Sequence, residues 1–270
     1  MIYLNGRSSL FVTRIIAIVN QKGGVGKTTT AVNLSAYLAR LGKSVLLIDL
    51  DPQGNATSAF GIDHRSQPEG IYESLAGLVP VSQVLQATSV EGHKLAPASI
   101  SLAGANIELV NLDRREHRLR DTLQGIASAF DYIIIDCPPS LGLLTVNALV
   151  GADEVLIPLQ AEYYALEGLS GLLETISLVR ENLNPSLDVL GALITMYDER
   201  FKLTHDVFHE LYRYFPNRIF RTVIPRSIRL AEAPSYGKTI LHYDPRSKGA
   251  RAYGKLAKEI VLTESLEAGS

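Results

Sequence analysis

The sequence is poor in cysteine and has no long apolar run. Its 270 residues include one cysteine, Cys137, so neither a disulfide framework nor a cysteine metal site can form within one chain. No uncharged apolar run approaches the ~20 residues that a membrane helix needs. Positions 1–13 lack a basic start followed by an apolar stretch, so we expect no signal peptide. These absences favour a protein of the reducing cytoplasm that has no membrane partner.

Strong net charge is also missing. The chain carries −2 with histidine neutral, so its overall charge does not indicate a nucleic-acid partner. The distribution is nevertheless uneven, because positions 221–258 hold nine basic and two acidic residues, which is +7 for the segment and −9 for the rest. Such a basic region can attract a polyanion, or it can be a solvated face. The nine basic residues are Arg221, Arg226, Arg229, Lys238, Arg246, Lys248, Arg251, Lys255 and Lys258.

Apolar runs alternate with helical patterns along the chain. The runs are rich in Ile, Val and Leu on both faces, as expected for parallel strands that are buried on both sides. The alternation predicts an α/β fold, an open, mostly parallel twisted sheet with helices on both faces. The expected strands are 14–20, 44–50, 132–138, 153–159 and 187–196, and the expected helices are 27–42, 113–130, 166–183 and 203–215.

The domain organisation follows from the same pattern. No repeat, low-complexity segment or linker interrupts the chain, and 46% hydrophobic residues are enough for one large core. We therefore expect a single domain at 14–262. Positions 1–13 would be a flexible N-terminal arm, and 263–270 would be a polar tail.

Three polar loops follow expected strands. Open parallel sheets bind ligands at the carboxyl ends of their strands, so these loops should converge on one edge. The loops are NQKGGVGKTTT (20–30), DLDPQGNAT (49–57) and DCPPSLGLLT (136–145).

The first loop nearly matches the phosphate-binding pattern G-x-x-x-x-G-K-[ST]. Positions 26–28 (GKT) complete it, but Gln21 stands where the opening glycine belongs, and Lys22 follows. The glycines at 23, 24 and 26 allow backbone N–H groups to surround phosphate oxygens, and the helix that starts near Lys27 adds its positive end. Lys27 should bridge the β- and γ-phosphates of a nucleotide, and the Thr28 hydroxyl should ligate Mg²⁺.

Carboxylates end the other two strands. Asp136 terminates the run YIIID, where a carboxylate can hold Mg²⁺, or it can simply cap the following loop. Asp49 and Asp51 follow the second strand, and one of them could orient a water that attacks the γ-phosphate. The residues alone do not choose between these two.

These three loops together resemble the deviant Walker A class of P-loop ATPases, and most closely its ParA/Soj partitioning branch. The resemblance runs from about Arg14 to Ile260. The loop KGGVGKTT indicates the superfamily, and the stretches QAEYYALEGL (160–169) and VIPRSIRLAEAPSYGKTI (223–240) indicate the branch.

The resemblance implies a role for most of the site. Lys22 is the signature lysine that reaches the nucleotide of a partner subunit, Asp51 positions the hydrolytic water, and Asp136 is the Walker B acid. ATP contacts are implied for Lys22, Gly23, Gly24, Val25, Gly26, Lys27, Thr28 and Thr29, with adenine contacts at Thr195–Asp198 and Pro225. Mg²⁺ contacts are implied for Thr28, Asp51 and Asp136. Non-specific DNA contacts are implied for Arg200, Arg226, Arg229, Lys238 and Arg246.

The implied function is ATP-driven DNA partitioning. ATP and Mg²⁺ would close a homodimer, the dimer would hold non-specific double-stranded DNA, and hydrolysis stimulated by a ParB/Spo0J-type centromere-binding protein would release it. The protein would then be cytoplasmic and associated with the nucleoid.

Other classes share parts of this pattern. A MinD-like ATPase has the same loops but needs a C-terminal amphipathic membrane helix, and the ending LAKEIVLTESLEAGS is acidic after Lys258. An iron-protein reductase needs two cysteines per subunit. A module that uses ATP as a structural switch would not need Asp51 and Asp136. A metabolic kinase would need an acceptor pocket, which the sequence does not identify.

Overall fold

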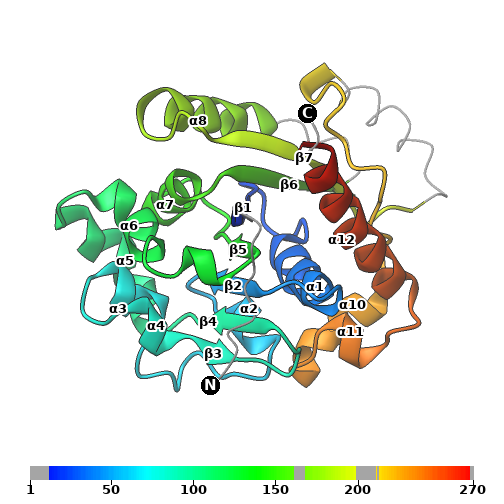
Figure 1. Ribbon diagram of the computed structural model, residues 1–270, viewed down its shortest axis with the longest axis horizontal. Helices are drawn as coiled ribbons and strands as arrows, with labels where there is room; N and C mark the ends of the chain where they lie inside the picture. The colour runs from blue at the N-terminus through cyan, green and yellow to red at the C-terminus, as the bar shows by residue number, and fades with distance from the viewer. Residues whose placement is uncertain (1–11, 161–167, 199–210, 212, 268–270) are drawn as a thin grey trace, which may run out of the picture.

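The computed structural model describes residues 12–160, 168–198, 211 and 213–267. Its centre is a seven-stranded sheet in the order β3-β4-β2-β5-β1-β6-β7, with helices on both faces (Figure 1). Neighbouring strands are parallel, except that β3 pairs antiparallel with β4 at one edge. The predicted α/β class is therefore confirmed. The strands are β1 (Arg14–Ile18), β2 (Val45–Asp49), β3 (Gln86–Ala87), β4 (His93–Ala96), β5 (Tyr132–Asp136), β6 (Glu154–Gln160) and β7 (Asp188–Thr195).

Successive side chains of the central strands enter two different hydrophobic clusters. Along β1, Ile16 and Ile18 belong to one cluster, and Ala17 belongs to the other. Side chains alternate between the faces of a strand, so a strand that is covered on both faces must be apolar at every position. This explains the uninterrupted apolar runs in the sequence.

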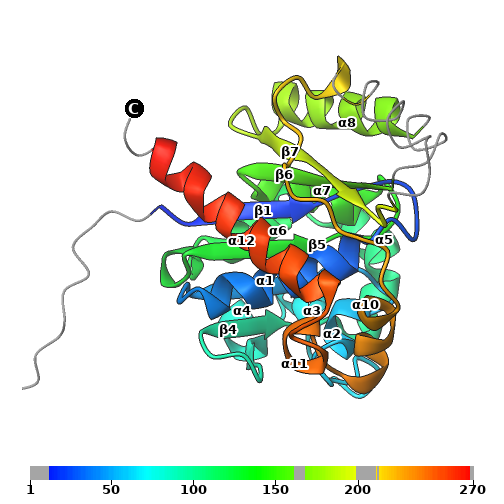
Figure 2. The ribbon, with the colours of Figure 1, turned by 90° about the vertical axis from the view of Figure 1, so that its right-hand side faces the viewer.

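Each cluster is closed by its own set of helices (Figures 1 and 2). One face is covered by α1 (Lys27–Arg40), α2 (Asn55–Ser58), α10 (Ile228–Glu232), α11 (Ile240–Tyr243) and α12 (Lys248–Glu267). The other is covered by α3 (Ile71–Leu75), α4 (Val81–Val84), α5 (Ala105–Glu108), α6 (Arg118–Leu123), α7 (Leu143–Gly151) and α8 (Leu169–Asn182). Short 3₁₀ turns lie between them at η1 (Ile100–Gly104), η2 (Leu109–Asn111), η3 (Arg115–His117), η4 (Ala127–Ala129) and η6 (Ala233–Tyr236).

Two expectations about the elements need correction. The single helix predicted at 113–130 is wrong, because the segment forms η3, α6 and η4 instead. Arg114 has a left-handed backbone (φ 52°), which prevents a helix from starting at position 113, and the poor helix former Gly125 follows α6. Strands β3 and β4 were not predicted, because they span only two and four residues. Most of the helix predicted at 203–215 lies outside the described residues.

The ends of the predicted domain are attached to the sheet. The Thr13 hydroxyl donates to the carbonyls of Ala127 and Phe130, and Arg14 pairs with Glu154 at 2.7 Å. At the other end, α12 continues to Glu267, through the first part of the predicted polar tail. Within the described ranges, no helix is long and apolar enough to cross a membrane.

A buried histidine joins β4 to α1. His93 is 2% exposed, its Nε2 lies 3.0 Å from the Ser35 hydroxyl and its Nδ1 lies 3.1 Å from the Thr88 hydroxyl. Its ring stacks on Phe60 at 4.8 Å. Burial lowers the pKa of His93 from 6.5 to about 3, so the folded protein holds this ring neutral.

This histidine makes stability dependent on pH. Because the pKa is lower in the folded state than in the unfolded state, the unfolded chain takes up the proton first, and stability falls as the pH drops below about 6.5. Between pH 7.5 and 5.5 the loss due to His93 should be about 1.4 kcal/mol. Urea unfolding of the wild type and of His93→Gln at both pH values measures it. An identical pH dependence in the two proteins would contradict the assignment.

Candidate functional site

The loop between β1 and α1 is open and held from both sides. Gly24 and Gly26 have left-handed backbones (φ 74° and 90°), and the helix starts at Lys27. A side chain could not adopt these angles without strain, so the glycines are required by the turn itself. Asn20 fixes the start of the loop by accepting from the Lys22 N–H at 2.8 Å and donating to Pro158 at 2.7 Å.

A cavity of about 300 Å³ opens over this loop. It brings the glycine loop together with residues that follow β2 and β5, as the sheet topology predicted. The lining residues are Gly23, Gly24, Gly26, Lys27, Thr28, Thr29, Asp51, Gln53, Asn55, Pro139 and Met196. Gln53, Asn55, Pro139 and Met196 were not among the predicted ligand-binding residues, because nothing in a sequence indicates which side of a loop faces a cavity.

Asp136 lies beneath the cavity as a buried carboxylate without a partner. It is fully buried, and neither of its oxygens has a hydrogen-bond partner in the described part of the chain. Burial, and then the charge of its strand neighbour Asp49, raise the pKa of Asp136 well above the usual range; the nearby Thr28 hydroxyl and Lys27 ammonium oppose this rise. A buried acid of this kind needs a cation.

These groups suit a magnesium ion. Carboxylate and hydroxyl oxygens are hard ligands, and Mg²⁺ in phosphate sites usually takes one or two protein ligands and completes its shell with phosphate oxygens and water. The described residues contain no group of three His, Cys, Asp or Glu side chains that could hold a metal by themselves. Thr28 and Asp136 are the residues that would hold Mg²⁺ beside a nucleotide, with Asp51 at the same cavity.

Lys27 is the buried cation of the site. It is 6% exposed, and its ammonium donates to the Lys22 carbonyl at 3.1 Å. Burial lowers the pKa of Lys27, while the charges of Asp136 and Asp51 raise it. The strand–helix turn thus presents a lysine at the floor of an open phosphate-sized cavity.

The structure distinguishes the two acids after β2. The Asp49 carboxylate accepts from the backbone N–H and the hydroxyl of Thr57, both at 2.7 Å, and so anchors α2. Burial raises the pKa of Asp49 to about 6. Asp51 instead lines the cavity, with its Oδ1 accepting from the Gln53 N–H at 2.9 Å. Of the two, Asp51 is the one that faces the cavity.

Three predicted nucleotide contacts lie off the cavity wall. Val25 is 2% exposed, and its carbonyl accepts from the Thr195 hydroxyl at 2.7 Å, so β7 supports the loop from behind. Lys22 is exposed at the mouth of the loop. Pro225 is half-buried and forms a bridge with Tyr197. Asn20 and Thr195 are supporting residues whose role depends on contacts 138 and 170 positions away, which the sequence does not show.

The predicted DNA contacts lie on a different face from the cavity lining. Arg226, Arg229, Lys238 and Arg246 are exposed, and they belong to α10, α11 and the loops that adjoin them (Figure 2). Lys238 also lines a second cavity of about 420 Å³, which shares Thr28, Thr29 and Asn55 with the first. Arg200 lies outside the described residues.

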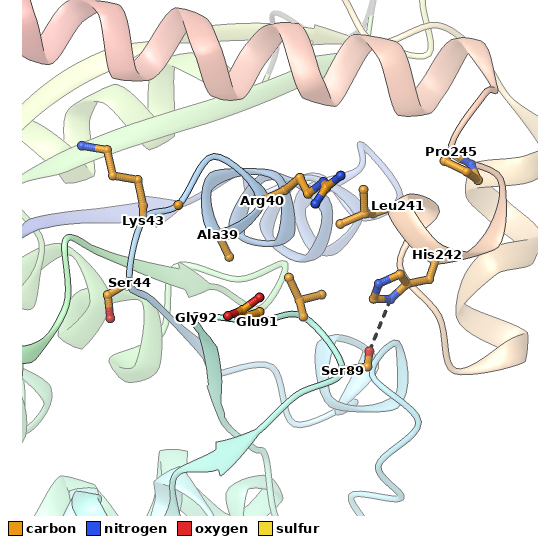
Figure 3. A pocket seen from close by; sticks show the side chains of 12 residues that line it. Ala39, Arg40, Lys43, Ser44, Ser89, Glu91, Gly92, Leu241, His242 and Pro245 are labelled. Atoms are coloured by element: carbon orange, nitrogen blue, oxygen red, sulfur yellow. Dashed lines mark hydrogen bonds between the residues drawn. The ribbon is translucent and has the colours of Figure 1, made fainter.

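Another pocket, of about 730 Å³, lies at the opposite end of the strands (Figure 3). It is lined by the end of α1, by residues 89–92 before β4 and by residues 241–245. Ser89 meets His242 there at 3.3 Å. The pocket is larger than the cavity at the glycine loop, but it has no glycine turn and no helix N-terminus to receive a phosphate, so size does not identify the site here.

Substituting Asp136 should separate metal binding from folding. Asp136→Asn removes a buried, unpaired charge, so at pH 8 the free energy of unfolding without nucleotide should rise by roughly 1 kcal/mol or more. The thermal stabilisation that Mg²⁺ and ATP give the wild type should be lost. Thermal unfolding with and without Mg–ATP tests both, with the exposed Asp113→Asn as control. Full stabilisation of Asp136→Asn by Mg–ATP would rule out the metal role.

Comparison with known proteins identifies the family. A family model described as an AAA domain matches residues 13–189. The chain is 56% identical over 247 residues to the sporulation initiation inhibitor protein Soj of Bacillus subtilis, covering 92% of this chain and 98% of that protein. It is 53% identical over 254 residues to the chromosome partitioning protein ParA of Myxococcus xanthus, covering 94% and 90%.

Solved structures agree on the fold. A Mycobacterium smegmatis structure described as cobyrinic acid a,c-diamide synthase with bound ADP and magnesium has a TM-score of 0.83 at 40% identity, covering 96% of this chain and 97% of that one. The cell division ATPase MinD of Pyrococcus furiosus has a TM-score of 0.75 at 27% identity, covering 93% and 99%. These titles name different activities, whereas the relatives above share about half their sequence over nearly the whole chain. The chain therefore belongs to the ParA/Soj family of P-loop ATPases.

Proposed function

We propose that this protein is an ATP-dependent DNA-partitioning ATPase. The observation that carries the proposal is the cavity in which the glycine loop, Lys27, Thr28 and Asp51 meet above the unpaired Asp136. A separate exposed group of basic residues supports a polyanion partner. The titles of the Soj and ParA relatives support chromosome partitioning as the process.

The cavity supports attack of water on the γ-phosphorus of ATP. Lys27 would neutralise the β- and γ-phosphates, and backbone N–H groups of the loop would hold their oxygens. Asp51 would orient the attacking water. Thr28 and Asp136 would hold the Mg²⁺, which supplies charge neutralisation at the phosphates. Because the phosphoryl group transfers with little help from covalent chemistry, positioning and charge account for most of the rate.

Lys22 would connect ATP to dimer formation. Its side chain is exposed at the mouth of the loop rather than along the cavity wall, which suits a lysine that acts on the nucleotide of a second subunit. A cation supplied across the interface makes the dimer depend on the intact γ-phosphate. Hydrolysis would then loosen the dimer.

The ATP dimer would bind non-specific double-stranded DNA through Arg226, Arg229, Lys238 and Arg246, and also through Arg200. A ParB/Spo0J-type protein would stimulate hydrolysis and so release the DNA. The protein would act in the cytoplasm, on the nucleoid. Contacts of this type bind phosphates and carry no sequence information.

Binding to a long DNA duplex of arbitrary sequence tests the proposal. We expect binding with Mg–ATP, and little with ADP or without nucleotide. If four cations from each of two subunits contact phosphates, affinity should fall on the order of a thousandfold between about 50 and 200 mM salt. Absence of DNA binding in every nucleotide state, with an intact ATP dimer, would favour the MinD-like alternative that acts on a membrane or a protein scaffold.

Lys22→Ala should separate ATP binding from dimerisation. The glycine loop and Lys27 are unchanged, so ATP should still bind with about wild-type affinity. The ATP-dependent dimer should be lost, because the cation in the partner's site is missing. Light scattering with ATP measures the dimer, and the exposed Lys94→Ala on β4 is the control. A normal ATP dimer in Lys22→Ala would refute the role of this lysine across the interface.

A further inference from the structure

Arg229 is held by two carboxylates although it is exposed. It lies on α10, its Nη1 donates to Glu232 Oε2 at 3.1 Å, and its Nε lies 3.6 Å from Asp244 Oδ2. The side chain is 58% exposed. A guanidinium has five N–H donors, so these two contacts leave donors for a further acceptor on the solvent side.

The carboxylate that holds Arg229 is itself fixed. Glu232 Oε2 also accepts from the Tyr243 hydroxyl at 3.0 Å. The Tyr243 ring packs on the Tyr236 ring, with centroids 5.1 Å apart and the planes 30° apart. The chain of contacts therefore runs from η6 through α11 to α10 and ends on one arginine.

Stability does not account for this arrangement. Ion pairs between exposed side chains contribute little to folding, because the charges are well solvated and two long side chains must be ordered. What the network does achieve is to restrict the guanidinium before any ligand arrives. A restricted side chain loses less entropy on binding, which is the basis of preorganisation.

We propose that Glu232 and Tyr243 are positioning residues that hold the guanidinium of Arg229 ready for a DNA phosphate. This inference rests on the proposed function. It gives a reason why two acidic residues, Glu232 and Asp244, lie within the otherwise basic segment 221–258. Such carboxylates oppose phosphate binding by charge and would be unfavourable unless their effect on the arginine is larger.

Charge and positioning predict opposite results for Glu232→Gln. The substitution makes the surface more positive by one, so charge alone predicts tighter DNA binding. Loss of positioning predicts weaker binding, by roughly three- to tenfold, because the arginine keeps only part of a charge-assisted hydrogen bond. The plot of log affinity against log salt should also become less steep by about 1, although the protein has gained positive charge.

Two further variants isolate the effect. Tyr243→Phe removes the hydroxyl and keeps the ring against Tyr236, and it should weaken DNA binding in the same direction by a smaller factor. In the Arg229→Ala background, Glu232→Gln should no longer weaken binding, because the residue through which it acts is absent. Glu91→Gln, an exposed acid at the opposite end of the strands (Figure 3), is the control for loss of one negative charge.

DNA binding with Mg–ATP across a salt series is measured for each variant, and thermal unfolding confirms that they fold. Weaker binding and a smaller slope in Glu232→Gln, both absent in the Arg229→Ala background, would support the inference. Equal or tighter binding by Glu232→Gln, or equal weakening in the Arg229→Ala background, would overturn it. A wild-type protein that binds no DNA would instead overturn the proposed function from which it starts.

Discussion

The structure depends on the burial of negative charge at the end of a parallel sheet. Asp49 and Asp136 are neighbours on adjacent strands, both fully buried, and Asp136 has no hydrogen-bond partner in the described part of the chain. Two such carboxylates repel each other and are costly to remove from water. The fold compensates in two ways: Thr57 satisfies Asp49, and Lys27 places a buried cation near Asp136. What remains unsatisfied on Asp136 is the binding capacity that the site offers to a metal.

The first helix connects this site to the basic segment. The Asn33 side chain accepts from the Ile240 N–H at 2.8 Å, and Thr30 meets Tyr253 of α12 at 3.2 Å. A second connection follows the loop after Asp51. A side chain at Gly237 would come within 2.7 Å of Gly61 Cα, so two backbones touch there without side chains between them. Elements that carry opposite steps of the proposed cycle are therefore packed directly against each other.

Much of this was readable in the sequence, and the reasons are local. Continuous apolar runs indicated the five long parallel strands, and GKT between a strand and a helix indicated the glycine loop. The misses have local causes too. The strands at 86–87 and 93–96 are too short to show a pattern, and a left-handed backbone at Arg114 interrupts an apparently helical segment. The roles of Lys22, Asp51 and the DNA-contacting arginines came from resemblance to a family, and they remain proposals for this chain.

The sequence by itself determined the class of fold, the phosphate-binding loop and the acid that ends the β5 strand, because strand burial and glycine turns depend on near neighbours in the chain. Only the tertiary structure decided between Asp49 and Asp51, since the choice depends on which carboxylate Thr57 occupies. It also decided that Arg229 is held by Glu232 and Asp244, and that Thr195 supports the loop from 170 positions away. These are contacts between segments brought together by the sheet, and no local pattern encodes them.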